Sequence, residues 1–364
     1  RPLLRSWPAA RPRGVRGCRH ERLPVLPHRR RRDPQRHRPG DPRAAGLPRH
    51  RPQAASGAAA AAHPGGRSLL SAAGAGPVAA TAPGSAAGLA GPGRISVGNF
   101  RDFVLGARIM DGKGQDLTFG GKVMKNVAGY DISRLIPGSL GTLALLLEAS
   151  VKVLPKPAAT ATLRCEISQA QALKILNEWA GQPLPISASC WIGSATGGEC
   201  QLMIRLAGAA AAIQAAIPVM SSLVLATEVD PQIASTFWKD LREQKLAFFN
   251  RIGDSQTLYR LALPASCGPL NIPDAANEIV LEWHGQQRWF IAPGDEATFE
   301  KIKQIATNHG GHASRFKQGA GVDPMLQRFT LLSEQTHSKA LEIVQARLRA
   351  AFDPSGVFAT SRLP

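Results

Sequence analysis

Apolar and polar positions follow a regular pattern from Arg101 onward. Residues 102–110 are a strand candidate, and the Asp-Gly-Lys-Gly turn that follows predicts a hairpin to a second short strand over 115–119. Residues 142–157 begin with a continuous apolar run and continue in alternation, which predicts a long strand stopped by the prolines at 155 and 157. We therefore expect a domain boundary at Pro157.

Strand candidates and amphipathic helices alternate beyond Ala158. One helix is predicted to start at Ser168, an N-cap with Gln171 in the capping-box position. The pattern gives two cycles of strand, helix and strand joined by hairpins, with the helices on one face of an antiparallel sheet. The other expected helices cover residues 209–218, 231–249, 295–309 and 333–352, and the expected strands cover 161–167, 185–193, 199–208, 221–229, 257–264, 277–285, 287–293 and 312–317.

Charge divides the chain into two unequal parts. The net charge of +18 would by itself suggest a nucleic-acid partner. However, residues 1–84 hold 17 arginines, no lysine and three acidic residues, a net charge of +14, whereas residues 85–364 carry only +4. The first part also lacks Ile, Met, Asn, Tyr and Phe, so it cannot bury a core and we expect it to be disordered.

The missing residue types indicate that residues 1–84 are GC-rich DNA translated in a wrong frame, because the absent types share A/T-rich codons. Two alternatives are a basic nucleic-acid-binding arm and an Arg-rich transit peptide. A basic arm has no reason to exclude lysine. We therefore favour the frame error and expect no nucleic acid among the partners.

The five cysteines are scattered and form no Cys-x-x-Cys pair. They argue against a disulfide framework and against a zinc or iron–sulfur site within this chain, and they favour a reducing compartment. The uncharged run over 206–227 is long enough to span a bilayer. It is mostly alanine and carries Gln214 and Pro218, so we expect a buried helix that ends near Pro218, then a strand, and no transmembrane segment.

The sequence contains no complete dinucleotide-binding fingerprint, no Walker A motif and no His-Glu-x-x-His motif. The densest polar cluster lies over residues 308–316, where His309, His312 and Arg315 are weak catalytic candidates. The two histidines fit either a metal pair or, more simply, a helix end with a glycine C-cap. Arg315 fits either a carboxylate substrate or an acidic partner within the fold.

Residues 120–141 are rich in glycine and poor in catalytic side chains. They end in a Gly-Ser-Leu-Gly turn, Gly138 to Gly141, ahead of the long predicted strand. Glycine lets backbone N–H groups approach a phosphate or a flavin ring without a Cβ clash. The segment therefore predicts a cofactor cradle, with an ordinary strand-entry turn as the alternative.

Together with GLAGP at 88–92 and RDFVLGARI at 101–109, these motifs make the chain resemble the FAD-binding subunit of the bacterial glycolate oxidase (glycolate dehydrogenase) complex. That family belongs to the flavoproteins similar to vanillyl-alcohol oxidase. The resemblance implies an α+β chain. It would hold part of a two-subdomain FAD-binding domain of the PCMH type over 85–157, and a ferredoxin-like cap domain with a C-terminal helix over 158–364. Other matching motifs, in the same order, are FGGKVMKNVAGYDISRL, VKVLPKP, PLPIS, FWKDLREQ, GGHASRF and DPSGVF.

The resemblance also implies FAD as the cofactor, held mainly by backbone atoms. Gly88, Ala90 and Gly91 correspond to a segment that lies along the FAD pyrophosphate and ribityl chain, and Gly98 and Asp102 to the adjoining turn and strand start. The family's first phosphate loop is missing where residues 1–84 lie, so we expect the chain to bind FAD poorly. The remaining implied contacts come from the second glycine pair and the strand after it, namely Gly138, Gly141, Ala144 and Leu145.

The complex that this family serves oxidises glycolate to glyoxylate, with the flavin as hydride acceptor. The resemblance implies a sister FAD-linked catalytic subunit and an iron–sulfur subunit as partners. It also implies a cytoplasmic location, either free or at the inner membrane surface through the complex. We expect the isolated chain to be inactive. The alternative is a non-catalytic assembly subunit of the same complex that has lost flavin binding.

Overall fold

The structure is a computed structural model in which residues 88–121, 130–194, 200–272, 278–322 and 339–359 are described. The chain divides into two compact units, residues 1–56 and 57–364, and the first lies wholly outside the described residues. The predicted frame-shifted segment, residues 1–84, also lies outside them. In the described ranges, no helix is both long and apolar enough to cross a bilayer.

A three-stranded antiparallel sheet, in the order β2-β1-β3, contains the predicted hairpin. Its strands are β1 (Val104–Met110), β2 (Asp116–Gly120) and β3 (Leu145–Val151). Apolar side chains on one side of this sheet, among them Ile109 and Ala144, form a small core with Ile136. The hairpin turn is tied to the C-terminal helix α8 (Lys339–Phe352), because the Gly112 amide donates to the Phe352 carbonyl at 2.8 Å.

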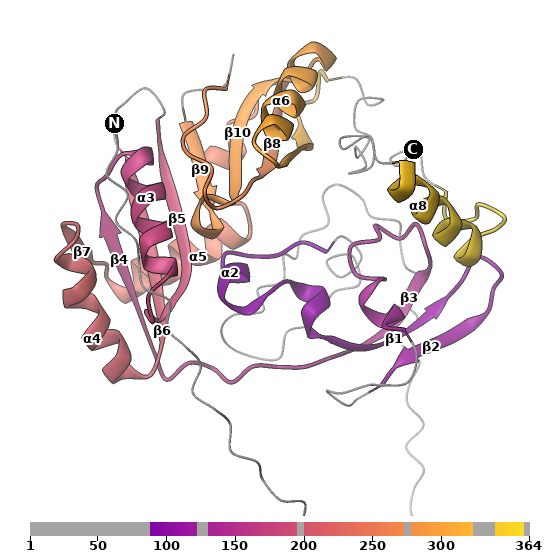
Figure 1. Ribbon diagram of the computed structural model, residues 1–364, viewed down its shortest axis with the longest axis horizontal. Helices are drawn as coiled ribbons and strands as arrows, with labels where there is room; N and C mark the ends of the chain where they lie inside the picture. Colours follow the sequence, from indigo (N-terminus) through magenta and orange to yellow (C-terminus); the bar gives the residue numbers. More distant parts are fainter. Residues whose placement is uncertain (1–87, 122–129, 195–199, 273–277, 323–338, 360–364) are drawn as a thin grey trace, which may run out of the picture. The chain divides into compact units, whose positions relative to one another are not determined.

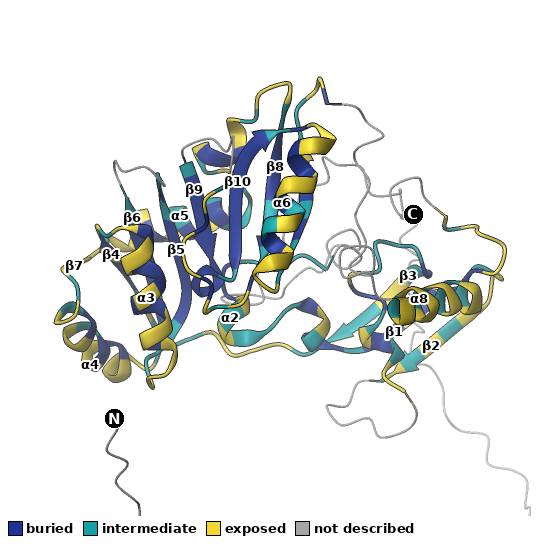
Figure 2. Cartoon of the chain, turned by 45° about the horizontal axis from the view of Figure 1, so that its top comes forward, coloured by how far each residue is buried: buried dark blue, intermediate teal, exposed yellow. Residues whose placement is uncertain are grey.

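An eight-stranded antiparallel sheet follows along the chain, in the order β11-β8-β10-β9-β5-β6-β4-β7. Apolar side chains alternate between its two faces, and strands β8, β9 and β10 are buried along most of their length (Figure 2). The strands are β4 (Ala159–Cys165), β5 (Ile186–Ser194), β6 (Gln201–Gly208), β7 (Ala226–Glu228), β8 (Gln256–Ala262), β9 (Glu278–Glu282), β10 (Gln287–Pro293) and β11 (His312–Gln318). The α+β class predicted from the sequence is confirmed.

Helices cover both faces of this sheet, so the expectation that they share one face is wrong. Three helices pack on one face: α3 (Gln169–Ala180), α4 (Ala210–Ser221) and α6 (Glu296–Asn308). The fourth, α5 (Pro231–Arg242), packs on the other face through Ala234, Trp238 and Leu241, and Figure 1 shows it behind the strands that α3 covers. The apolar face of a helix predicts that the helix packs against the sheet, but it does not predict which face of the sheet the helix covers.

Local sequence signals predicted the start of a helix correctly, but they did not predict where a helix ends. The capping box is confirmed, since the Ser168 amide donates to Gln171 Oε1 at 3.0 Å and the Gln171 amide to Ser168 Oγ at 3.3 Å. Helix α4, in contrast, continues through Pro218 to Ser221, and the strand after it is only three residues long. Pro218 and Gln214 are exposed, so the carbonyl that proline leaves without a donor is on the solvent side of the helix, while buried Met220 holds the last turn.

Candidate functional site

The glycine turns predicted to form the cradle come together in the structure. Gly88 (φ +61°) and Gly138 (φ +89°) are in direct backbone contact, since a Cβ added to Gly88 would lie 2.7 Å from the Gly138 Cα. Gly141 (φ +78°) borders open space, because a Cβ there would meet no described atom within 4 Å. Glycine at these positions therefore permits a left-handed backbone, a close approach of two segments and an open surface beside them.

The Gly138–Gly141 turn presents donors and acceptors that the fold does not use. Its internal bonds run from the Ser139 amide to the Ile136 carbonyl and from the Thr142 amide to the Ser139 carbonyl. Within the described part of the chain, the amides of Gly138 and Gly141 donate no hydrogen bond, and the buried Ser139 hydroxyl has no partner. Unused amides in a tight turn can hold an anion, so the turn fits a phosphate-bearing cofactor such as FAD.

The other implied cofactor residues belong to the loop that leads into β1 and to the start of β3. Gly98 (φ +91°) follows the short helix α2 (Arg94–Val97), and a Cβ there would clash with Asp102 Oδ2 at 2.8 Å. Asp102 in turn accepts a hydrogen bond from the Asn99 amide at 2.9 Å. Ala144 is buried in the small core and Leu145 begins β3. Asp102 thus fixes the loop that leads from the glycine segment into β1.

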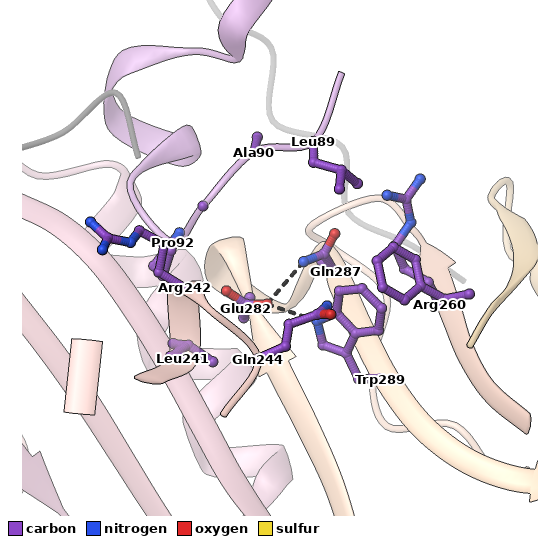
Figure 3. Close-up of a pocket in the computed structure, with 12 residues that line it drawn as sticks. Leu89, Ala90, Pro92, Leu241, Arg242, Gln244, Arg260, Glu282, Gln287 and Trp289 are labelled. Carbon is purple, nitrogen blue, oxygen red and sulfur yellow. Dashed lines mark hydrogen bonds between the residues drawn. The ribbon is translucent and has the colours of Figure 1, made fainter. Parts of the chain in front are cut away.

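A pocket lies where residues 89–92 meet the face of the large sheet on which α5 packs (Figure 3). Trp283 Nε1 donates to the Gly91 carbonyl at 3.1 Å, which holds this segment against the connection between β9 and β10. The Arg94 guanidinium lies over the Trp283 ring, 4.4 Å from its centroid. The residues lining the pocket are Leu89, Ala90, Gly91, Pro92, Leu241, Arg242, Gln244, Arg260, Glu282, Gln287, Trp289 and Phe316.

The connection between β9 and β10 is strained. Trp283, His284 and Gly285 have φ angles of +54°, +57° and +82°, so three successive residues are left-handed and two of them carry side chains. Such conformations cost free energy and persist only when the surroundings impose them. Here the His284 amide donates to Ser189 Oγ at 3.1 Å, and the buried His284 Nε2 has no partner among the described residues.

Glu282 is a buried carboxylate at the base of the pocket. Its Oε2 accepts hydrogen bonds from Trp289 Nε1 at 2.7 Å and from Gln287 Nε2 at 2.9 Å, the two dashed contacts in Figure 3. Burial raises the pKa of Glu282 to about 7, although both hydrogen bonds and the charge of Arg260 act in the opposite direction. Glu282 therefore changes its charge near neutral pH.

Arg260 is influenced by another cation, Arg94, as well as by Glu282. Burial, followed by the charge of Arg94, lowers the pKa of Arg260, and only Glu282 acts to raise it. Burial lowers the pKa of His312, and the charges of Arg260 and Arg94 lower it further. The basic side chains of Arg94, Arg260 and His312 therefore disfavour one another's charged forms.

The three residues proposed from the segment 308–316 lie in different environments. His309 is exposed after α6, with Nδ1 2.9 Å from the Ile305 carbonyl. His312 is on β11, on the face that carries the pocket. Arg315 is on the opposite face, where it donates to Glu296 Oε2 at 2.8 Å and lies over the Phe299 ring. No group of three His, Cys, Asp or Glu side chains within the described ranges is placed to hold a metal.

We did not predict Arg260 and Glu282 as site residues, although the sequence contains a signal for both. Each sits at a position of an apolar strand where alternation places the side chain on a buried face. A charged residue at such a position is rare unless it is paired or has a function. Applying that rule to the predicted strands would have identified both residues.

Comparison with known proteins relates the chain to glycolate oxidase subunits and to a hydroxy-acid dehydrogenase. No protein-family model matches it. Over 278 residues, 76% of this chain and 70% of the relative, it is 41% identical to glycolate oxidase subunit GlcE of Escherichia coli strain K12. Shorter stretches are 45% identical to glycolate oxidase subunit GlcD of Bacillus subtilis strain 168, over 19% of this chain and 15% of the relative, and 36% identical to a D-2-hydroxyglutarate dehydrogenase of Xanthomonas citri pv. viticola, over 17% and 13%. The chain belongs to the family of glycolate oxidase subunit GlcE, which confirms the resemblance read from its motifs.

Among solved structures, the chain is similar to alkyldihydroxyacetonephosphate synthase in two crystal forms. The TM-scores are 0.48 and 0.46 at 14% sequence identity, and the match covers 75% of this chain and 56% of each synthase chain.

Proposed function

We propose that this chain is the FAD-binding subunit of a glycolate oxidase (glycolate dehydrogenase) complex that oxidises glycolate to glyoxylate. The observation that carries the proposal is the contact between Gly88 and Gly138, which brings two separate glycine segments to one place and leaves amides free beside it. Family membership supports the same assignment. The partners would be a sister FAD-linked catalytic subunit and an iron–sulfur subunit, in the cytoplasm or at the inner membrane surface.

The residues present fit the flavin nucleotide through their backbones. The amides of Gly138 and Gly141 would hold a phosphate, and the segment from Gly88 to Gly91 would lie along the cofactor chain. When bound, FAD would accept a hydride from the 2-hydroxy acid. The fold would supply position and exclude water, and the described residues around the turn offer no evident catalytic base.

Replacing Gly141 with alanine should weaken FAD binding about tenfold, since its Cβ would enter the space where the cofactor lies. Quenching of FAD fluorescence on titration with the full chain measures the dissociation constant even if binding is weak. The matched control is Gly114→Ala in the β1–β2 hairpin, because Gly114 also has a left-handed backbone (φ +76°) and open space around it. Equal FAD affinities for the two variants, or no quenching by the unaltered chain, would contradict the proposal.

Activity measurements separate a flavin-binding subunit from an assembly subunit. Glycolate-dependent dye reduction would be compared between the isolated chain and the reconstituted complex. If the complex contains the Gly141→Ala chain and keeps full activity without flavin on it, the chain serves only assembly. A loss of activity that follows the loss of flavin supports the proposed role.

A further inference from the structure

We propose that Arg260 is the anchor of a binding site for the carboxylate group of a small 2-hydroxy acid, and that Glu282 controls this site through its own charge. The inference rests on the proposed function for the identity of the acid, whereas the anion site itself rests on the geometry of the pocket. Neither residue is part of the glycine turns that would hold the cofactor.

The Arg260 guanidinium is available to a ligand. In the described part of the chain it donates no hydrogen bond and forms no ion pair, although it lines the pocket and is half-buried. In Figure 3 its guanidinium points toward the Leu89 side of the pocket. Arginine presents donors in a planar fork that matches a carboxylate, so a half-buried arginine without a partner favours such a ligand.

The neighbouring charges leave Arg260 uncompensated. Arg242 also lines the pocket, but its Nε is 2.8 Å from Glu243 Oε1 and its charge is balanced there. Arg94 is occupied by the Trp283 ring, yet it still repels Arg260. The carboxylate that acts on Arg260 is Glu282, whose Oε2 already accepts hydrogen bonds from Trp289 and Gln287.

Titratable and polar groups near the pocket come from several elements, and those on β8 and β10 act on Glu282 itself. Strand β8 brings Arg260, which favours the ionised form. Strand β10 brings Trp289 and Gln287 as hydrogen-bond donors. Strand β5 brings Cys190, whose pKa is raised by burial and by Glu282, so it stays neutral. Arg94 on α2 is a cation that acts on Arg260. His312 on β11 has a lowered pKa and is therefore neutral at about pH 7.

An anion bound at Arg260 would repel the ionised form of Glu282. Binding should therefore be coupled to protonation of Glu282 and should strengthen as the pH falls through about 7. His312 acts in the same direction at lower pH, since its protonation adds a positive charge. Binding of a 2-hydroxy acid at Arg260 would thus be accompanied by uptake of one proton by Glu282. The protonated Glu282 side chain would then lie beside the bound acid as an uncharged carboxyl group.

The test is a titration of the full chain with sodium glycolate, followed by tryptophan fluorescence, because Trp289 touches Glu282 directly. We expect saturable binding that is about tenfold weaker at about pH 8.5 than at about pH 6. Arg260→Met should weaken binding at least about thirtyfold, as expected for the loss of a charged, partly buried hydrogen-bonding partner. Glu282→Gln should bind glycolate with the same affinity at both pH values.

Three controls make the result decisive. Arg251→Met removes an exposed arginine that pairs with Glu278, and it should leave glycolate binding unchanged. Glycolamide, the neutral amide of glycolate, should not bind. Inorganic pyrophosphate tests whether the pocket instead takes a cofactor phosphate, and competition by pyrophosphate at lower concentration than glycolate would overturn the proposal. Thermal unfolding of each variant, followed by circular dichroism, shows that it is folded.

Absence of glycolate binding, equal binding of glycolamide, or an unchanged affinity in Arg260→Met would also overturn the inference. Titration of the same samples with FAD keeps the two proposals apart. A chain that binds FAD but not glycolate would refute only the carboxylate site. A chain that binds glycolate at Arg260 but never binds FAD would refute only the proposed cofactor role.

Discussion

Replacing Arg288 with methionine is expected to lower the free energy of unfolding by about 3–5 kcal/mol. Arg288 is only 1% exposed, and its guanidinium donates three hydrogen bonds to backbone carbonyls. They reach the carbonyls of Gly285 at 3.1 Å, Gly268 at 2.6 Å and Cys267 at 2.5 Å. Methionine would fill much of the same volume but donate none of them, and each buried acceptor left without a donor costs about 1–3 kcal/mol.

Arg288 also explains how the chain tolerates its strained connection. The Gly285 carbonyl belongs to the left-handed run that starts at Trp283, and Trp283 holds the glycine segment at Gly91. Burial lowers the pKa of Arg288 because desolvation disfavours its charge, and the three carbonyl dipoles that accept its hydrogen bonds act against that effect. The side chain thus links β10 to both the β9–β10 connection and the loop at Cys267.

Urea unfolding followed by circular dichroism measures this effect, with Arg164→Met as the control. Arg164 pairs with Glu166 at 2.8 Å, but both side chains are largely exposed. Exposed ion pairs contribute about 0–1 kcal/mol, so this control should unfold almost as the unaltered chain does. A loss below about 1 kcal/mol in Arg288→Met would show that water replaces the three donors.

The sequence allowed most of the large sheet to be predicted, because burial of two sheet faces imposes alternation on each strand. The order of the strands could not be predicted in the same way. Strands β8 and β9 are separated by β10 in the sheet, so Arg260 and Glu282 meet across a strand that follows both in the chain. No local pattern records that arrangement, and the pocket therefore became visible only in the fold.

The glycine turns could be predicted from the sequence because glycine is the residue type that readily adopts a left-handed backbone. Gly88, Gly138 and Gly141 all adopt left-handed conformations that other residues rarely accept. Element ends were less predictable. Helix α5 ends at Arg242, well before the predicted end at 249, and Gln244 just beyond it is left-handed (φ +53°). A glutamine in the sequence does not predict a left-handed conformation, because tertiary contacts impose it at this position.

Replacing Glu282 with glutamine is expected to raise the free energy of unfolding by up to about 3 kcal/mol above about pH 8, and to change it little near about pH 4. The pKa of Glu282 is raised by burial from 4.5 to about 7 in the folded chain. As the pH rises between these values, the unfolded chain releases a proton that the native chain still holds. Stability from this group is therefore complete at low pH and is lost as the pH rises through about 7.

Glutamine removes this dependence because it carries no charge at any pH, and its carbonyl oxygen still accepts from Trp289 and Gln287. Urea unfolding at several pH values between about 4 and 9 would measure the difference between the two chains. The control is Glu278→Gln at the exposed start of the same strand, where the carboxylate pairs with Arg251 at 2.7 Å. Glu278→Gln should show no comparable increase in the free energy of unfolding at high pH. If Glu282→Gln and the unaltered chain instead kept a constant difference across the range, Glu282 would be ionised throughout, and the proton-coupled binding of an acid at Arg260 would lose its physical basis.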